Sequence, residues 1–389
     1  MPATVALLLT AFASGCTSSE PATSARAAAS TTPTANSTPT VPATWSLAAT
    51  SLGNLEATAS LESVSCSGDS DCWAVGWAQV PQARPLTTQG PGAGWSSVLG
   101  GAQPEGASGR LFGVSCVSAS DCWAVGYAGL IEHYDGSGWS AVPGPSLPGG
   151  AWAFLFGVTC FGPGECWAVG ESVGAGSNNT APLVEEYAAG EWSLVSAPPP
   201  DDSESYLAGV ACVSAGDCWA VGKLNGDGGD PKTLIEQYAD GLWSVVPSPS
   251  PPGGGGQLND VSCTSENHCW AVGSTARTAT SSAPLIEQYG GTSWSVAASP
   301  APVSEESQLM GVACAGAARC WAVGYSGAHP LIEGDTGSGW RVVASPSPPG
   351  NAETELNGVA CASTGECFAA GGVTEMVTDE GAPAFVEET

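Results

Sequence analysis

Short apolar runs separated by turn-forming residues recur along most of the chain, with a period of about 49 residues. Each copy opens with a run that ends in Cys, such as LFGVSC at 111–116. After five residues a second run follows, which is CWAVG at 122–126 in that copy. Short apolar runs bounded by Ser, Asp and Gly are typical of β-strands that a hairpin loop joins. Because no stretch shows sustained helical periodicity, the pattern predicts an all-β chain.

A second hairpin follows the first in each copy. Its clearest form is LIEQYADGLWSVV at 234–246, where two apolar strands flank a Gly-bearing turn. A loop rich in Pro, Ser and Gly then leads to the next copy, so each copy predicts four strands, which we name a to d in chain order. The first copy, at 85–98, lacks the Glu and Tyr of this hairpin. The other copies lie at 130–142, 183–195, 285–297 and, in degenerate form, 331–343.

Repeats of four strands and about 40–50 residues are typical of β-propellers, in which each repeat forms one blade. Strand a carries small residues at alternate positions, which suits crowding near a central channel. The Trp that opens strand d suits the wider space between the outer parts of the blades. The repeat therefore predicts a propeller of four-stranded blades.

The two ends of the repeat set complement each other. The last copy has strands a (356–361), b (367–371) and c (383–388) but no strand d, whereas the segment 43–47 reads as an isolated strand d. Trp45 then supplies the seventh strand-d Trp, to match seven Cys pairs. We therefore predict a seven-bladed ring closed by the N-terminal strand. Closure removes the exposed sheet edges of the alternative, an open array.

Apart from Cys16, every Cys belongs to one of seven pairs, each six residues apart. Zinc sites need further ligands at fixed spacing, and no His accompanies these pairs, while redox thiols usually occur as C-x-x-C. The ends of adjacent hairpin strands lie within disulfide distance. One structural disulfide per blade is therefore expected, and it requires an oxidising compartment. The expected bridges are Cys66–Cys72, Cys116–Cys122, Cys160–Cys166, Cys212–Cys218, Cys263–Cys269, Cys314–Cys320 and Cys361–Cys367.

The order of the motifs resembles the Kelch repeats of galactose-oxidase-like propellers, in which a strand ending in Gly-Gly precedes a Tyr and a Trp. Here CWAVG corresponds to that strand, and YDGSGW at 134–139 corresponds to the Tyr and Trp. The resemblance covers residues 44–389 at the level of the repeat pattern, although most copies have one Gly, with Gly371–Gly372 the exception. It implies a propeller fold and no particular activity, because such folds host many functions.

The N-terminal segment predicts export. Residues 5–13, VALLLTAFA, form an apolar run too short to span a bilayer. The following Ser-Gly-Cys16 resembles a bacterial lipobox, whose Cys is lipidated, although Ala13 replaces the usual Leu and no Lys or Arg precedes the run. An ordinary secretory signal is the alternative. We expect a signal peptide at 1–16, a flexible Ser/Thr/Pro/Ala-rich linker at 17–43 and the propeller at 44–389.

The charge narrows the choice of partners. Eight Lys and Arg against 37 Asp and Glu give a formal net charge of −29, which excludes nucleic-acid binding because that needs clustered cations. Membrane contact is expected only through a lipid anchor. The three His argue against a multi-His metal site, and no cofactor is expected. We expect a monomer that is extracellular or anchored at the surface of a bacterial cell.

Propeller ligands usually bind where the loops that join strands b to c and d to a surround the channel, and the b–c loops vary between copies here. Trp77 and Trp152 are the two Trp outside the repeat positions, and each could stack on a sugar ring or pack between blades. By contrast, an acid recurs in strand c of five copies, which indicates a structural role. These acids are Glu132, Glu185, Glu236, Glu287 and Glu333.

Four charged or titratable residues complete the candidate binding site. Asp227 and Asp230 could hold Ca²⁺ or form a plain turn, since the alternating spacing of a full calcium loop is absent. The other two candidates are Arg277 and His329.

These observations favour a non-enzymatic binding or scaffold module for an extracytoplasmic protein or glycan, and no catalytic residue can be assigned. The alternative is a sialidase-like hydrolase or lyase that acts on polysaccharides. Against it, the Trp in Asp135–Trp139 follows the Asp by four residues rather than the five of Asp-box repeats. Convergent Arg residues, or carboxylates about 5–9 Å apart at one channel mouth, would favour the enzyme. The Arg residues of the repeats are Arg84, Arg110, Arg277, Arg319 and Arg341.

Overall fold

The computed structural model describes residues 44–48, 50–51, 58–80, 82–91, 94–100, 108–176, 180–197, 204–225, 230–249, 255–278, 281–301, 306–346, 348, 353–375 and 384–389, all within one compact unit, residues 39–389. Of residues 50, 51, 277, 278, 374 and 375 only the backbone is described. The expected signal peptide, Cys16 and the linker at 17–43 lie outside the described residues.

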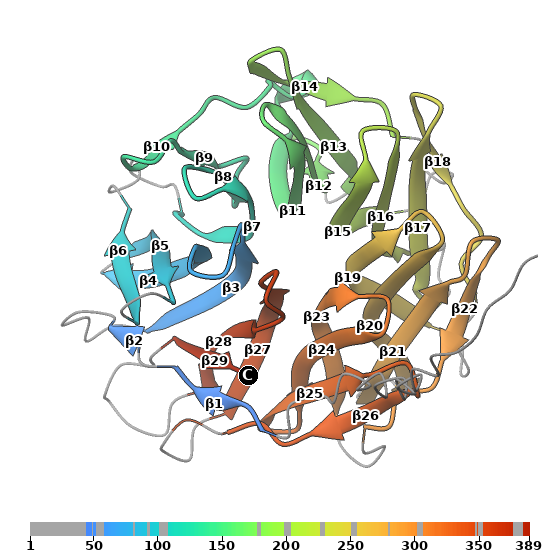
Figure 1. Cartoon of the computed structure of the whole chain (residues 1–389). Coiled ribbons are helices and arrows are strands. Elements are labelled where there is room, and N and C mark those ends of the chain that lie inside the picture. Colours follow the sequence, from blue (N-terminus) through green and yellow to red (C-terminus); the bar gives the residue numbers. More distant parts are fainter. Residues whose placement is uncertain are drawn as a thin grey trace, which may run out of the picture. The chain divides into compact units, whose positions relative to one another are not determined.

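The described residues form a β-propeller of seven blades, and strand a of each blade lies innermost (Figure 1). Blades 2 to 6 are separate four-stranded antiparallel sheets, whereas a bridge between Gly372 and Ser60 joins the sheets of blades 7 and 1. The predicted fold class is therefore confirmed.

The strands follow in chain order. Blade 1 contains β3 (Ala59–Cys66), β4 (Cys72–Val80), β5 (Gln82–Gly90) and β6 (Trp95–Leu99); blade 2 contains β7 (Leu111–Ser118), β8 (Asp121–Gly126), β9 (Ile131–Tyr134) and β10 (Trp139–Ala141). A 3-10 turn, Pro148–Gly150, precedes blade 3, which contains β11 (Trp152–Gly162), β12 (Glu165–Val173), β13 (Thr180–Ala188) and β14 (Glu191–Val195). Blade 4 contains β15 (Ser205–Ser214), β16 (Asp217–Leu224), β17 (Lys232–Ala239) and β18 (Leu242–Val245). Blade 5 contains β19 (Gly256–Ser265), β20 (His268–Thr278), β21 (Ser281–Tyr289) and β22 (Trp294–Ala297). Blade 6 contains β23 (Ser307–Gly316), β24 (Arg319–Ser326), β25 (His329–Asp335) and β26 (Trp340–Val343).

Blade 7 combines both ends of the repeat set. Strands β27 (Glu353–Cys361), β28 (Cys367–Glu375) and β29 (Phe385–Glu388) come from the last copy, and β1 (Ser46–Leu47) pairs antiparallel with β29 as the outer strand. The predicted closure of the ring is thus confirmed. One further strand was not predicted: β2 (Thr50–Ser51) pairs in parallel with β6, so the N-terminal segment contacts blade 7 and then blade 1.

Aromatic pairs connect each blade to the next. The aromatic residue that follows the second Cys, at the start of strand b, packs edge-on against the strand-d Trp of the following blade, with ring centroids 5.2–5.6 Å apart. Edge-to-face packing is the favourable geometry for such rings. The seven pairs are Trp73–Trp139, Trp123–Trp192, Trp167–Trp243, Trp219–Trp294, Trp270–Trp340, Trp321–Trp45 and Phe368–Trp95.

All seven predicted disulfides are present, each within the a–b hairpin of its own blade, with Cα atoms 4.0–4.1 Å apart. Seven bridges in one chain are typical of proteins outside the cytoplasm. In the part of the chain that the structure describes, no helix has both the length and the apolar character needed to cross a bilayer.

The acids of strand c lie in the interior of the blades. The structure adds a sixth to the five expected, because Glu387 of blade 7 pairs with Ala369 as Glu333 of blade 6 pairs with Ala322. All six are at most 5% exposed. In three blades a Ser that follows strand d of the preceding blade donates to this acid. These hydrogen bonds join Ser248 to Glu287 (3.1 Å), Ser299 to Glu333 (2.6 Å) and Ser345 to Glu387 (2.9 Å).

Candidate functional site

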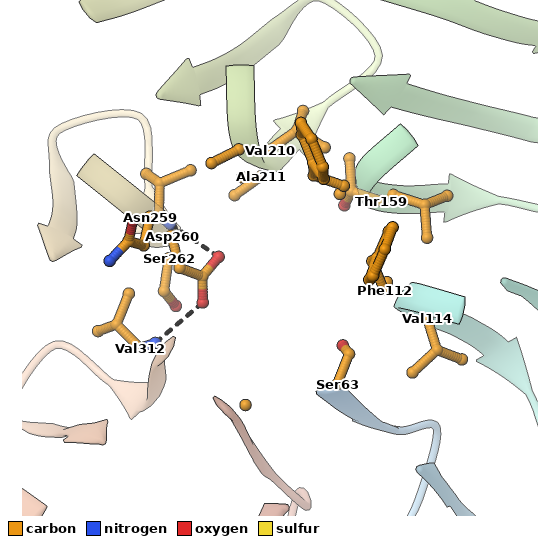
Figure 2. A pocket seen from close by; sticks show the side chains of 18 of the residues that line it. Ser63, Phe112, Val114, Thr159, Val210, Ala211, Asn259, Asp260, Ser262 and Val312 are labelled. Carbon is orange, nitrogen blue, oxygen red and sulfur yellow. Dashed lines mark hydrogen bonds between the residues drawn. The ribbon is translucent and has the colours of Figure 1, made fainter. Parts of the chain in front are cut away.

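The centre of the propeller contains a cavity of about 290 Å³, lined by strand a of all seven blades. Figure 2 shows it from close by. Because strand a runs from the d–a loop toward the a–b hairpin, its first residues surround the mouth on the side of the b–c and d–a loops. This is the side on which the sequence predicts ligand binding.

A β-bulge occurs at the same place in every blade. The register between strands a and b skips one residue after the Leu that opens the motif, for example Phe156 between Leu155 and Gly157. A bulge turns its extra side chain away from the regular direction of the strand. All seven bulge residues line the cavity. They are Glu62, Phe112, Phe156, Ala208, Asn259, Met310 and Asn357.

The bulge residues were missed from the sequence, although a signal exists. The motif keeps Leu before the bulge and a small residue or Asp after it, while the bulge position itself carries acid, aromatic, aliphatic and amide side chains. A position that varies between otherwise uniform repeats is a candidate for binding.

Close approach of neighbouring blades explains the small residue after the bulge. A Cβ added to Gly157 would lie 2.8 Å from the carbonyl oxygen of Ala208, and one added to Gly209 would lie 2.7 Å from the Cα of Asp260. Five blades have Gly here, whereas blade 1 has Ser63 and blade 5 has Asp260.

Asp260 places a carboxylate in the wall of the cavity (Figure 2). Its oxygens accept hydrogen bonds from the backbone N–H groups of Val261 (2.8 Å) and of Val312 in blade 6 (2.9 Å). Burial raises the pKa of Asp260 to about 7, and the two hydrogen bonds oppose this shift.

An arc of aromatic residues surrounds the mouth over blades 2 to 4. Phe156 lies 5.8 Å from Phe112 and 5.9 Å from Tyr206, measured between ring centroids. Tyr127 and Phe154 form an edge-on pair at 5.0 Å. The arc thus presents a continuous apolar wall that three neighbouring blades supply.

Trp77 extends this wall to blade 1. Its indole N–H donates to Glu62 Oε1 at 2.9 Å, and the Arg110 guanidinium lies 4.3 Å from its ring centroid, in cation–π contact. Burial raises the pKa of Glu62, and hydrogen bonds and the charge of Arg110 act in the opposite direction. The three side chains hold one another in place at the mouth.

The opposite side of the mouth is polar. The Asn259 amide donates to the Leu309 carbonyl (2.7 Å) and the Asn357 amide donates to the Leu61 carbonyl (3.1 Å), so both bulge residues bond the next blade. Burial, together with the charge of Glu62, raises the pKa of Glu355 to about 7. The mouth therefore has one aromatic side and one side of amides and acids.

Among the predicted binding residues, Trp77 belongs to this mouth. Trp152, which is 60% exposed, Asp230 and His329 lie on three different blades. Asp227 and the side chain of Arg277 lie outside the described residues, so their assignment stays a prediction. Within the described residues, no three His, Cys, Asp or Glu side chains gather as metal ligands.

The described Arg side chains are dispersed. Arg84 donates to the Gly100 carbonyl at 3.1 Å, and Arg341 donates to Thr336 and Ser338 in a c–d turn. Among these and Arg110 no cluster forms that would grip a carboxylate.

Comparisons with known proteins identify the fold. No model of a protein family matches the chain, and no curated protein matches it in sequence. Among solved structures, "YCF48 bound to D1 peptide" covers 88% of this chain and 96% of its own, with a TM-score of 0.54 and 16% identity. YCF48 from Cyanidioschyzon merolae covers 89% and 98%, with a TM-score of 0.54 and 14% identity. The WD40 β-propeller domain of Doa1 covers 89% and 96%, with a TM-score of 0.57 and 11% identity. At these identities the likeness shows the β-propeller fold alone.

Proposed function

We propose that this protein is a non-enzymatic binding module outside the cytoplasm, and that the mouth on the b–c side binds a segment of another protein. The observation that carries the proposal is the pairing of an aromatic side with a polar side around one cavity. Seven bulge residues of five types on a uniform scaffold build this site. Buried aromatic anchors next to satisfied polar groups are typical of protein recognition.

A solved neighbour supports the choice of a peptide over a glycan. YCF48 shares the fold and was determined bound to D1 peptide. The experiment that tests this site also includes glycans as the alternative ligand.

The same proposal includes attachment to the cell surface and kinship to Kelch repeats. Lipidation of Cys16 would tether the propeller through residues 17–43, in agreement with the oxidising compartment that seven disulfides require. Replacing Cys16 by Ser should release the protein from the membrane fraction or leave an uncleaved precursor. Unchanged attachment with normal cleavage would contradict the anchor.

The proposed kinship to Kelch repeats rests on the Gly-ending strand b followed by Tyr and Trp.

The binding site can be tested with a random peptide library displayed on phage and with a glycan array. We expect the intact protein to select peptides, and Phe156→Ala to abolish their binding. Ser120→Ala, in the exposed a–b hairpin of blade 2, is the matched control and should bind normally. Selection of glycans alone, or of peptides that bind Phe156→Ala unchanged, would refute a peptide site at this mouth.

One observation favours a polysaccharide hydrolase as the second candidate. Glu62 and Glu355 come from adjacent blades at one mouth, and the pKa of Glu355 is raised to about 7, as suits a general acid. Hydrolysis of oligosaccharides by the wild type, lost in Glu355→Gln, would establish the enzyme and overturn the non-enzymatic proposal.

A further inference from the structure

We infer that the central cavity takes a cationic side chain, Lys or Arg, projecting from the bound protein segment. This inference rests on the proposed function and specifies its ligand. It follows from the charge of the cavity wall, from the aromatic residues opposite, and from a departure from the repeat at Asp260.

The ionisable groups in the described part of the cavity wall are acids. Among the described residues that line it, Glu62 and Asp260 carry carboxylates, and none is Lys, Arg or His. Arg110 is already stacked on Trp77 beside the cavity. In a chain with a net charge of −29, few cations of its own are available to neutralise these groups. A basic partner is therefore the one that complements the charge of the site.

The aromatic part of the cavity wall suits the apolar stem of a Lys or Arg side chain. Phe112 and Phe156 both line the cavity, and Figure 2 shows Phe112 across the opening from Asp260. Ring faces attract cations, and the apolar stems of Lys and Arg pack well on aromatic surfaces. A cavity of about 290 Å³ has room for a side chain but not for a folded domain.

The propeller fold does not require a carboxylate at the position of Asp260. At two other blade interfaces, a Ser two residues further along strand a accepts a hydrogen bond from the next blade: Ser65 from Cys116 N–H (3.0 Å) and Ser115 from Cys160 N–H (2.9 Å). A neutral group can therefore join two blades, and five blades have only Gly where blade 5 has Asp260. A cationic ligand in the cavity would offset the free-energy cost of burying the carboxylate of Asp260.

The test uses the peptides selected by phage display on the intact protein. We expect them to be enriched in Lys or Arg beside an apolar residue. Acetylation of the key Lys in a synthetic peptide should weaken its binding about tenfold or more, since it removes the charge and keeps the stem. Binding should also weaken as salt concentration rises.

Matched variants locate the contact. Glu62→Gln and Asp260→Asn should each weaken the basic peptide about tenfold, as loss of one charge-assisted contact does. Glu191→Gln removes an exposed acid on β14 and should leave affinity unchanged. If Asp260→Asn unfolds, as circular dichroism would show, Glu62→Gln alone decides the matter.

The outcomes separate this inference from the proposed function. Peptides that lose binding in Phe156→Ala but need neither a basic residue nor Glu62 would overturn the inference and keep the peptide site. Selection of acidic peptides would also overturn it. If no selected peptide depends on Phe156, the proposed function fails, and the inference fails with it.

Discussion

Ser345 donates a hydrogen bond of 2.9 Å to Glu387, and the bond joins the loop after strand d of blade 6 to a fully buried acid of blade 7. The Ser stands five residues after the strand-d Trp, as Ser248 and Ser299 do in blades 4 and 5. In blades 1 to 3 the same place holds Gly100, Gly144 and Ala197, which have no hydroxyl to offer. Glu236 is the strand-c acid of blade 4, the blade that follows Ala197. Both of its carboxylate oxygens are without a hydrogen-bond partner among the described residues.

This series predicts that Ser345→Ala lowers the free energy of unfolding by about 1–2 kcal/mol, because an acceptor is left unsatisfied in the interior. Chemical denaturation would measure it. Ser244→Ala, at an exposed position of β18, is the control and should change the stability little. Equal effects of the two substitutions would show that the hydrogen bond to Glu387 contributes nothing.

The buried acids predict that the protein is most stable in mild acid. Burial raises the pKa of Glu236, Glu287 and Glu387 to about 8, well above the usual 4.5. Between these values the folded state binds more protons than the unfolded state, so stability is greatest below about pH 4.5 and falls as the pH rises through 8. Melting temperatures measured across pH 5–8 should therefore decrease.

A matched pair of variants separates this effect from general repulsion by the net charge. Glu236→Gln should flatten the pH profile and raise the melting temperature at pH 8, because it removes a buried ionisation. Glu191→Gln removes one exposed charge and should leave the profile nearly as in the wild type. Identical profiles for both variants would assign the pH dependence to net charge alone.

Trp45→Ala should destabilise the last blade although Trp45 lies near the start of the described chain. The side chain is 4% exposed and packs edge-on on Trp321 at 5.2 Å. Truncation of a buried Trp costs about 3–5 kcal/mol. In limited proteolysis we expect the first new cuts within 350–389. Trp152→Ala, at a 60% exposed site, should behave as wild type. Cuts confined to blade 1 would contradict the closure contact.

Gly157→Ala should lower the melting temperature, since its Cβ would come within 2.8 Å of the Ala208 carbonyl oxygen and force two blades apart. Gly216→Ala is the control, because a Cβ there meets nothing within 4 Å. We expect differential scanning calorimetry to show a loss of several degrees for Gly157→Ala only.

Local patterns explain why the fold could be predicted. The spacing of the Cys pair recurs in all seven copies and the strand-d Trp in the first six. Trp45 could be assigned to blade 7 because the seventh copy lacks its own outer strand. Strand β2 was not predicted, because Thr50–Ser51 carries no pattern and its parallel pairing with β6 depends on the closed ring.

The site was less accessible to sequence reasoning. Trp77 was identified because it falls outside the repeat positions, but its contacts with Glu62 and Arg110 join residues of two blades. Phe112 and Phe156 lie in strand a, where regular alternation would direct their side chains to a face of the sheet. Only the bulge, which depends on strand pairing, directs them into the cavity.

The pairing of β1 with β29 also sets an order for biosynthesis. Each disulfide links residues six apart, so its hairpin can form as soon as it emerges during synthesis or export. Among the described strands, the one beside Trp45 emerges first, yet its partner at Phe385–Glu388 emerges last. Until then β1 lacks its strand partner and the large aromatic side chain of Trp45 stays uncovered, which exposes the nascent chain to aggregation. Folding of this ring is therefore completed only after translation has passed Glu388, however early the individual blades become stable.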